Sequence, residues 1–232
     1  MIGRSKVLAI IPARFGSQRL PKKNLMLLKG RPLVAWAIGA AKDSEFIDYV
    51  LVSTDDESTR KVALSYGASV PFLRPPELAT STASSFAVAQ HALYALNQLG
   101  HTFEIILLLQ PTSPLRTYRH IDAAINLFIE KKGDAVIGVV EEPHPIEWVN
   151  TLPEDCSMEK FFPPNLKDNS LDCPKRYRIN GAIYLCRAKR FLEEQTFFLK
   201  DNIWAYVMKA EHSVDIDTEL DFQFAEVLAS EQ

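Results

Sequence analysis

The sequence predicts an α/β protein whose core is a doubly wound, mostly parallel sheet. Short apolar runs alternate with amphipathic segments five times before residue 141, an order typical of strand, helix and strand units with right-handed crossovers. The run at residues 105–109 is apolar on both faces, as parallel strands between two helical layers are. Of the 232 residues, 47% are apolar, enough for one large core, and we expect a single domain over residues 1–232.

The first half of the chain contains three of the expected strands and two helices. They are a strand at 6–11, a helix at 32–42, a strand at 49–52, a helix that follows the polar cluster 53–56 and ends at Gly67, and a short strand through Val70 and Phe72. Pro12 ends the first strand because it cannot donate a ladder hydrogen bond. Pro32 suits the first turn of a helix, and Gly67 suits the position just after one.

The second half continues the alternation and is then interrupted. The expected elements are a helix at 82–100, a strand at 104–110, a helix at 121–133, strands at 135–140, 182–186 and 203–208, and a closing helix at 218–228. Residues 141–177 break this rhythm, because six prolines crowd a stretch with little periodicity. We therefore expect residues 141–177 to be an insertion within the domain.

The charge is distributed unevenly along the chain. Residues 1–42 carry nine Lys and Arg and no acidic residue, whereas the remainder carries 17 basic and 29 acidic residues. A local cationic segment on an acidic protein suits a compact anionic ligand better than a nucleic acid, which needs a basic face over the whole domain. No apolar run approaches the roughly twenty residues of a membrane span, and the three cysteines have no framework or metal-clip spacing. We expect a cytoplasmic protein that binds neither membranes nor nucleic acids.

The loop after the first strand is the first candidate binding site. Residues 12–24 contain four cations together with Gly16 and Ser17, and ligands of open α/β sheets bind beyond the carboxyl ends of strands. Neither common phosphate loop, G-x-x-x-x-G-K-[ST] or G-x-G-x-x-G, occurs here. The pattern therefore predicts phosphate binding by cationic side chains, with a solvated basic loop as the alternative.

Two carboxylates near the end of the chain form the second candidate site. Asp215 and Asp217 are two residues apart on an extended segment, so both side chains point to one face. Two hard oxygen ligands suit Mg²⁺ bound to a nucleoside triphosphate. The alternative for Asp217 is the N-cap of the closing helix. The five histidines show no metal-ligand spacing, and no G-x-S-x-G elbow indicates a serine nucleophile.

Five segments in order resemble the acylneuraminate cytidylyltransferases, the CMP-sialic acid synthetases. They are IPARFGSQRLPKKN at 11–24, LRPPELATSTASS at 73–85, LLQPTSPLR at 108–116, RINGAIY at 178–184 and VDIDTELD at 214–221. The first segment alone would also admit CMP-Kdo synthetases. The resemblance implies a Rossmann-like nucleotidyltransferase that transfers CMP from CTP to the anomeric hydroxyl of a nonulosonic acid and releases pyrophosphate. It also implies Mg²⁺ or Mn²⁺ as cofactor and a homodimer formed through residues 141–177.

The resemblance assigns roles to individual residues of this chain. The implied nucleotide-binding residues are Arg14, Ser17, Lys23, Asn24, Arg74 and Ser85, of which Arg74 and Ser85 match the cytosine site. The implied sugar-binding residues are Gln110, Arg178, Asn180, Tyr184, Phe197 and Phe198. Asp215 and Asp217 match the metal ligands. Arg14, Lys23 and Asp217 are the expected catalytic residues.

Two departures from the family pattern fall on the sugar side. Ser170 stands where an arginine is expected, and Glu147 ends a His-Pro-Leu-Lys pattern that here reads His-Pro-Ile-Glu. The acceptor is therefore open between N-acetylneuraminate, legionaminate, pseudaminate and Kdo. A nucleotide-binding protein without catalysis is a further alternative, against which Arg14, Lys23, Asp215 and Asp217 together argue.

Overall fold

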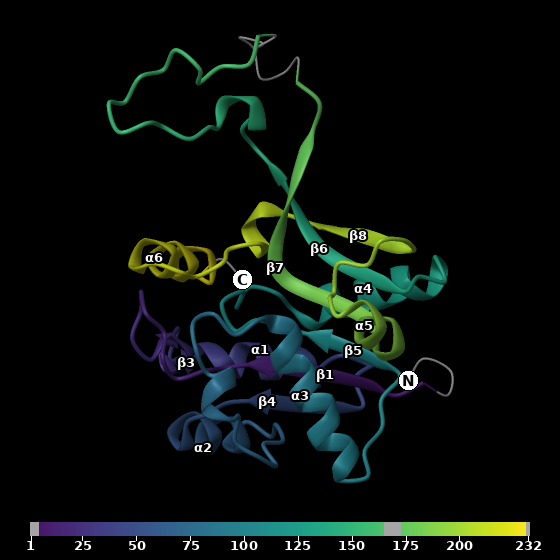
Figure 1. Ribbon diagram of the computed structural model, residues 1–232. Coiled ribbons are helices and arrows are strands. Elements are labelled where there is room, and N and C mark those ends of the chain that lie inside the picture. Colours follow the sequence, from purple (N-terminus) through teal and green to yellow (C-terminus); the bar gives the residue numbers. More distant parts are fainter. Residues whose placement is uncertain (1–4, 165–172, 231–232) are drawn as a thin grey trace.

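A computed structural model describes residues 5–164 and 173–230 of the chain (Figure 1). Its main sheet has six strands, in the order β4 (Tyr49–Ser53), β1 (Val7–Pro12), β5 (Ile105–Leu108), β7 (Arg176–Arg187), β6 (Ala135–Glu142) and β8 (Ile203–Met208). β4, β1 and β5 pair in parallel, as do β6 and β8, while β7 runs antiparallel to both of its neighbours. The mostly parallel sheet expected from the sequence is confirmed.

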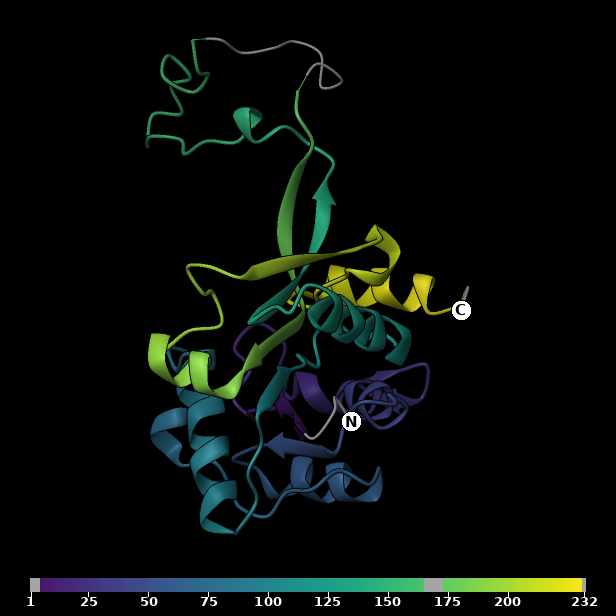
Figure 2. The same ribbon diagram turned by 90° about the vertical axis from the view of Figure 1, so that its right-hand side faces the viewer.

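Helices cover both faces of this sheet (Figure 2). α1 (Leu33–Lys42), α2 (Glu57–Ser65) and α4 (Tyr118–Glu130) pack on one face, and α3 (Ser85–Gln98) and α5 (Ala188–Glu194) pack on the other. β1 shows why the winding is double, since its alternate side chains enter the two different cores: Val7 and Ala9 one, Leu8 and Ile10 the other. α6 (Glu219–Leu228) lies against a third apolar cluster with the loop after β1.

The helices begin where polar side chains satisfy their first backbone N–H groups. Asp56 accepts from Thr59 at the start of α2, and Ser84 accepts from Ala87 across 3.1 Å at the start of α3. Thr218 begins α6 and forms a capping box with Asp221. Asp217 therefore is not the cap of the closing helix, and capping does not occupy its carboxylate.

One expected element was wrong, one helix was not expected, and one strand is longer than expected. No strand runs through Val70 and Phe72: Ser69 makes one isolated bridge to Leu51, and Pro71, which lacks an N–H, follows directly after Val70. The short helix α5 was not expected. In addition, β7 is longer than expected, because its first residues are exposed and show no apolar alternation.

An arm projects from the sheet where the insertion was expected. β6 and β7 continue beyond the body as an antiparallel ribbon that pairs Val139 with Ile179 and Glu142 with Arg176. The ribbon carries residues 143–164 away from the domain (Figures 1 and 2). Ser170 lies outside the described residues. Of the helices that the structure describes, none is long and apolar enough to cross a membrane.

Candidate active site

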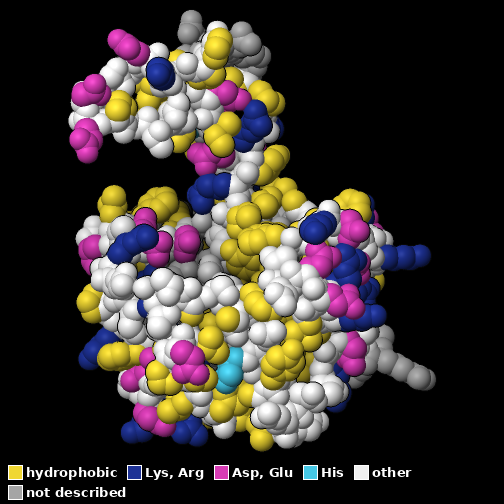
Figure 3. Space-filling view, viewed as in Figure 1, with side chains coloured by type: hydrophobic (Ala, Val, Ile, Leu, Met, Phe, Trp, Pro, Cys, Tyr) yellow, Lys and Arg dark blue, Asp and Glu magenta, His cyan; other side chains and the backbone are white. Residues whose placement is uncertain are grey.

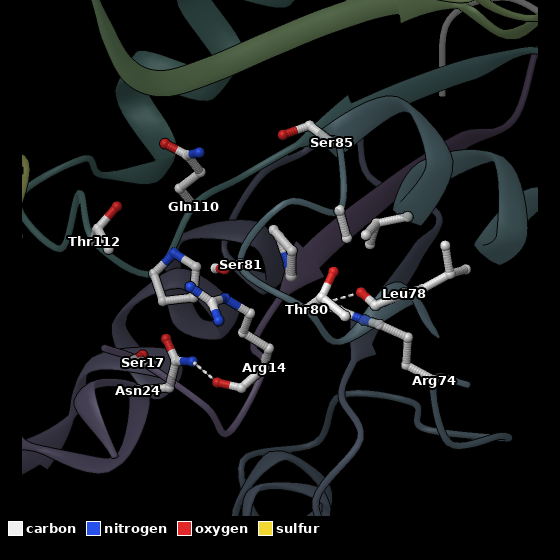
Figure 4. A pocket seen from close by; sticks show the side chains of 14 residues that line it. Arg14, Ser17, Asn24, Arg74, Leu78, Thr80, Ser81, Ser85, Gln110 and Thr112 are labelled. Atoms are coloured by element: carbon white, nitrogen blue, oxygen red, sulfur yellow. Dashed lines mark hydrogen bonds between the residues drawn. The ribbon is translucent and has the colours of Figure 1, made fainter. Parts of the chain in front are cut away.

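A pocket opens beyond the carboxyl ends of β1 and β5, beside the first turn of α3 (Figure 4). Its lining residues are Pro12, Arg14, Ser17, Asn24, Arg74, Leu78, Thr80, Ser81, Ala83, Ser85, Val88, Gln110, Pro111 and Thr112. Five of the six residues expected to bind the nucleotide line this pocket, although they come from two separate segments of the chain, 11–24 and 73–85. The sixth, Lys23, lines an adjoining pocket that shares Arg14 and Ser81 with the first.

The loop after β1 is held in shape by its own polar groups. The buried amide of Asn24 donates to the carbonyl of Arg14 across 2.8 Å, as Figure 4 shows. The guanidinium of Arg14 donates to the carbonyl of Gly16, and the backbone N–H of Phe15 donates to Asp55 across 2.9 Å. These bonds present the Arg14 side chain to the pocket, so Asn24 orders the loop from beneath.

Lys23 joins this loop to the carboxylate segment near the end of the chain. Its ammonium donates to Oδ1 of Asp217 across 2.9 Å and to the carbonyl of Ile216 across 2.6 Å. Arg19 donates to the other oxygen of Asp217 across 3.0 Å. The adjoining pocket therefore gathers three cations, Arg14, Arg19 and Lys23, around one carboxylate. Such an excess of positive charge suits a compact polyanion.

Asp215 belongs to the same segment but has different surroundings. Thr112 donates to its carboxylate, and the backbone N–H of Ile216 donates to the carbonyl of Thr112 across 2.8 Å. Burial raises the pKa of Asp215, and the charge of Asp217 adds to this, while the Thr112 bond and Lys23 oppose it. Asp215 and Asp217 are two hard oxygen donors, and among the described residues no third histidine, cysteine or acid completes a cluster. The pair fits a cation that also takes phosphate oxygens and water.

Arg74 forms one wall of the pocket and is almost entirely buried, with 4% exposure. Its Nε donates to the hydroxyl of Ser53 across 3.0 Å, and two further bonds reach the carbonyls of Ser53 and Leu78. Burial lowers its pKa to about 10, so the guanidinium stays charged at neutral pH. A guanidinium has five N–H groups, which leaves two for a ligand. Ser85, the first residue of α3, lies across the pocket (Figure 4).

Four of the residues expected to contact the sugar lie on β7 or against it. Gln110 lines the nucleotide pocket itself, and its amide also approaches Gly181 on β7. Tyr184 packs against Phe197 and Phe198 with ring centroids 5.8 and 6.1 Å away. Burial and the charge of Asp215 raise the pKa of the Tyr184 phenol. This aromatic group therefore adjoins the carboxylate segment.

The other two residues expected to contact the sugar, Asn180 and Arg178, bond to polar groups of the protein itself. Asn180 is 1% exposed, donates to Ser213 across 3.1 Å and accepts from the backbone of Ala182 across 3.1 Å. Its amide thus links β7 to Ser213 inside the core. Arg178 lies on the ribbon, where it forms an ion pair with Glu142 across 3.1 Å. The structure places Arg178 at the base of the arm.

Sequence reasoning missed several residues that line the cleft. Thr112, Ser81 and Arg19 were not singled out, although Thr112 follows a buried strand and Arg19 belongs to the cationic loop. Thr112 could have been predicted, because it follows a buried strand and ligands of open α/β sheets bind beyond the carboxyl ends of strands. Ser81 lies within the segment at 73–85 that carries the family resemblance, although the loop before α3 approaches the cleft only through tertiary packing.

Known proteins resemble this chain along nearly its whole length. The family model described as Cytidylyltransferase matches residues 8–226. N-acylneuraminate cytidylyltransferase of Escherichia coli is 39% identical over 223 residues, which are 96% of this chain and 52% of that protein. CMP-N,N'-diacetyllegionaminic acid synthase of Legionella pneumophila is 36% identical over 225 residues and 96% of each chain. This chain therefore spans about half of one relative and nearly all of the other.

A solved structure shares the fold at low sequence identity. The structure of CMP:2-keto-3-deoxy-manno-octonic acid synthetase complexed with CTP has a TM-score of 0.71 and 16% identity, and the match covers 98% of this chain and 99% of that one. The likeness supports the α/β nucleotidyltransferase fold.

Proposed function

The chain belongs to the cytidylyltransferase family, and we propose that it transfers CMP from CTP to the anomeric hydroxyl of a nonulosonic acid, releasing pyrophosphate. One observation carries the proposal: the pocket lined by Arg14, Asn24 and Arg74 adjoins a second pocket, which shares Arg14 and Ser81 with it and in which cations line the space beside Asp217. A base site that adjoins a polyanion site is the arrangement a nucleoside triphosphate requires. The E. coli and L. pneumophila relatives support the reaction class by their names.

Each half of the cleft has its own task in this proposal. The base lies between Arg74 and Ser85, where the two free N–H groups of Arg74 can donate to the carbonyl oxygen and ring nitrogen of cytosine. The triphosphate extends towards Arg14, Arg19 and Lys23. Fixed donors of this kind cost no reorganisation during the reaction.

The chemical step is an in-line displacement at the α-phosphorus. The acceptor's hydroxyl oxygen forms the new P–O bond, the bond to the pyrophosphate oxygen breaks, and the hydroxyl proton leaves to solvent or base. Lys23, only 12% exposed at its side chain, is placed to offset the charge that builds on the transferred phosphoryl group. Positioning and charge neutralisation therefore perform the catalysis, without a covalent enzyme intermediate.

Asp215 and Asp217 would hold a Mg²⁺ or Mn²⁺ ion together with phosphate oxygens. Such an ion supplies Lewis-acid stabilisation of the triphosphate charge. Within the chain, Asp215 is buried, which raises its pKa, and Asp217 lies between the cations of Arg19 and Lys23. Binding of the triphosphate by Lys23 and Arg19 would release Asp217 for the ion.

The acceptor site is assigned to the cleft end around Tyr184, Phe197 and Phe198. The half-exposed Phe198 offers an apolar wall of the kind an N-acyl group can contact. On the arm, Glu147 forms an ion pair with Arg176 across 2.7 Å, so one of the positive charges near the ribbon is cancelled. We therefore rank legionaminate or a related diacylamino acid beside N-acetylneuraminate as acceptor.

We also assign the arm to a two-fold dimer. Val149, Leu152 and Phe162 are 69%, 56% and 50% exposed, an unusual density of apolar side chains for a segment without a core. Figure 3 shows the arm standing clear of the body, with apolar side chains on its surface. A second copy of the chain is the surface that can cover them.

Pyrophosphate release with a panel of nucleotides and acids tests the proposal. CTP is expected to exceed UTP, ATP and GTP by about 10²-fold or more in kcat/KM, because the wrong base leaves buried donors unpaired. The acids are N-acetylneuraminate, legionaminate, pseudaminate and Kdo. Comparable turnover with UTP would contradict the base site, turnover with Kdo alone would contradict the nonulosonic acid, and no turnover with any acid would favour a silent nucleotide-binding protein.

A further inference from the structure

Arg116 is the largest fully buried side chain of the described structure, with 1% exposure. No carboxylate forms an ion pair with it among the residues described, and burial alone lowers its pKa to about 9. Burying an uncompensated charge is costly, and an apolar side chain of similar volume would generally stabilise a core better. A charge retained in such a place indicates a role other than stability.

The bonds of Arg116 join two strands where their pairing ends. Its Nη1 donates to the carbonyl of Gln110 across 3.2 Å and to the carbonyl of Ala182 across 3.0 Å. β5 and β7 pair up to Leu108 and Tyr184, and the same register continued would set Gln110 opposite Ala182. Pro111 then follows, which cannot donate a ladder bond. Arg116 thus holds the strands together two positions beyond their last ladder pair.

The residues just beyond this clamp lie in the cleft. Gln110 packs so closely over Gly181 that a Cβ there would lie 2.6 Å from its Oε1 and 3.5 Å from Oδ2 of Asp215. Gly181 also has a φ of +75°, which favours glycine. Thr112, in the turn after Gln110, donates to Asp215. One buried guanidinium therefore underlies the point where β5, β7 and the carboxylate segment meet.

We propose that Arg116 is a positioning residue that sets the distance between the two halves of the active site. On one side of its bonds lie Gln110 and Thr112, which line the nucleotide pocket. On the other side lies β7, which carries Gly181 and Tyr184. The identity of the ligand in each half rests on the proposed function, whereas the clamp itself rests on the hydrogen bonds alone.

The geometry favours arginine over lysine at this position. A planar guanidinium can direct both N–H groups of one nitrogen at two carbonyls, whereas an ammonium is a compact point charge on a flexible stem. Arg116→Lys keeps the charge and weakens the clamp, and Arg116→Met removes both. Phe128→Leu is the matched control, because Phe128 is equally buried, at 1% exposure, in α4 away from the cleft.

Hydrogen exchange measured by mass spectrometry tests the clamp without any substrate. In Arg116→Met, exchange of the amides at 109–113 and 180–184 should rise together by about tenfold beyond the global change, with Arg116→Lys intermediate. Phe128→Leu should raise exchange without favouring these two segments. An equal pattern in the Arg116 and Phe128 variants would overturn the proposal. If Arg116→Met does not fold, the exchange of Arg116→Lys is compared with that of Phe128→Leu instead.

Binding and kinetics then separate positioning from simple destabilisation. Calorimetric affinity for CMP should stay within about threefold, while kcat/KM for the acceptor falls by about 10²-fold, because misplacement of about 1 Å has effects of that size. Unchanged acceptor kinetics with locally raised exchange would overturn the catalytic part. A wild-type enzyme that turns over no sugar acid would instead contradict the proposed function, and the exchange result would still decide whether Arg116 is a clamp.

Discussion

The ammonium of Lys23 lies 2.9 Å from Oδ1 of Asp217, which joins the first loop of the chain to the segment before its last helix. Arg19 contacts the other oxygen of the same carboxylate at 3.0 Å. A triphosphate entering this pocket would compete with Asp217 for both cations. Binding of a polyanion would therefore release the Asp217 carboxylate from its ion pairs with Lys23 and Arg19.

Replacing Lys23 by methionine tests the catalytic cation. Turnover should fall by at least about 10²-fold, a loss of about 2.7 kcal/mol in transition-state stabilisation, because in the proposed reaction the lost charge would face the reacting phosphoryl group. Lys22→Met is the control, since Lys22 is an exposed neighbour whose ammonium lies over the ring of Phe15. Pyrophosphate release measures both variants. Equal losses in the two would show that only the overall charge of the loop matters.

Asp217→Asn and Asp221→Asn separate the metal role from helix capping. Asp217 pairs with cations in the cleft, whereas Asp221 accepts from Thr218 across 2.7 Å at the start of α6. Asp217→Asn should fold normally and lose at least about 10²-fold in magnesium-dependent turnover. Asp221→Asn should lower the free energy of unfolding by about 0.5–1 kcal/mol and leave turnover within about threefold. Wild-type activity in Asp217→Asn would remove the metal assignment.

The sequence predicted the elements whose side chains carry a periodic burial pattern. The strand at β8 was expected with its observed bounds, and α1 and α6 each within one residue. β7 was expected only at residues 182–186, because its exposed start on the ribbon has no apolar alternation to read. The strand predicted through Val70 does not form. The proline that follows Val70 cannot donate a ladder hydrogen bond, and the β-propensity of the neighbouring residues does not compensate for that loss.

Only those site residues that lie within a motif or directly after a strand could be predicted from the sequence. Arg14 and Lys23 lie in a cationic loop after a strand, a signal that needs no tertiary contacts. The pairing of Lys23 with Asp217 spans almost the whole chain, and no local pattern specifies it. Arg116 shows the same limit, since its two carbonyl partners lie on strands that only the folded sheet brings together.

We predict that the protein forms a concentration-dependent dimer through the arm. Sedimentation should show a dimer at micromolar concentration, and Leu152→Glu should shift it towards the monomer, because a charge would be buried against the partner. Leu220→Glu is the control, since Leu220 is 74% exposed on α6 in the body of the domain. A wild-type monomer at micromolar concentration, or dissociation by the control alone, would contradict the role of the arm.

We predict that the folded protein loses stability in mild acid because of His120. Burial, then the charges of His212 and Arg116, lower its pKa to about 4, while Glu211 opposes this. Its ring nitrogen accepts from the backbone N–H of Thr117 across 3.1 Å at the start of α4, so the neutral form caps the helix. Because the unfolded chain binds the proton more readily, stability is complete above about pH 6.5 and falls as the pH approaches 4.

Thermal unfolding of wild type and His120→Gln between pH 7.5 and 5 measures this effect. Glutamine also suits this capping position and does not titrate, so the variant should lose about 1 kcal/mol less than wild type over that range, since solvent screens this partly exposed ring. Identical pH dependence in the two proteins would show that His120 is not the group responsible.

Transfer of oxygen from the acceptor is the most direct test of the proposed reaction. A nonulosonic acid labelled with ¹⁸O at its anomeric hydroxyl is incubated with the protein, CTP and Mg²⁺, and the products are followed by ³¹P NMR. We expect a CMP-sugar phosphodiester whose phosphorus signal carries the isotope shift of the bridging oxygen, with unlabelled pyrophosphate. Label in the pyrophosphate, or pyrophosphate release without a CMP-sugar, would contradict CMP transfer to the anomeric hydroxyl.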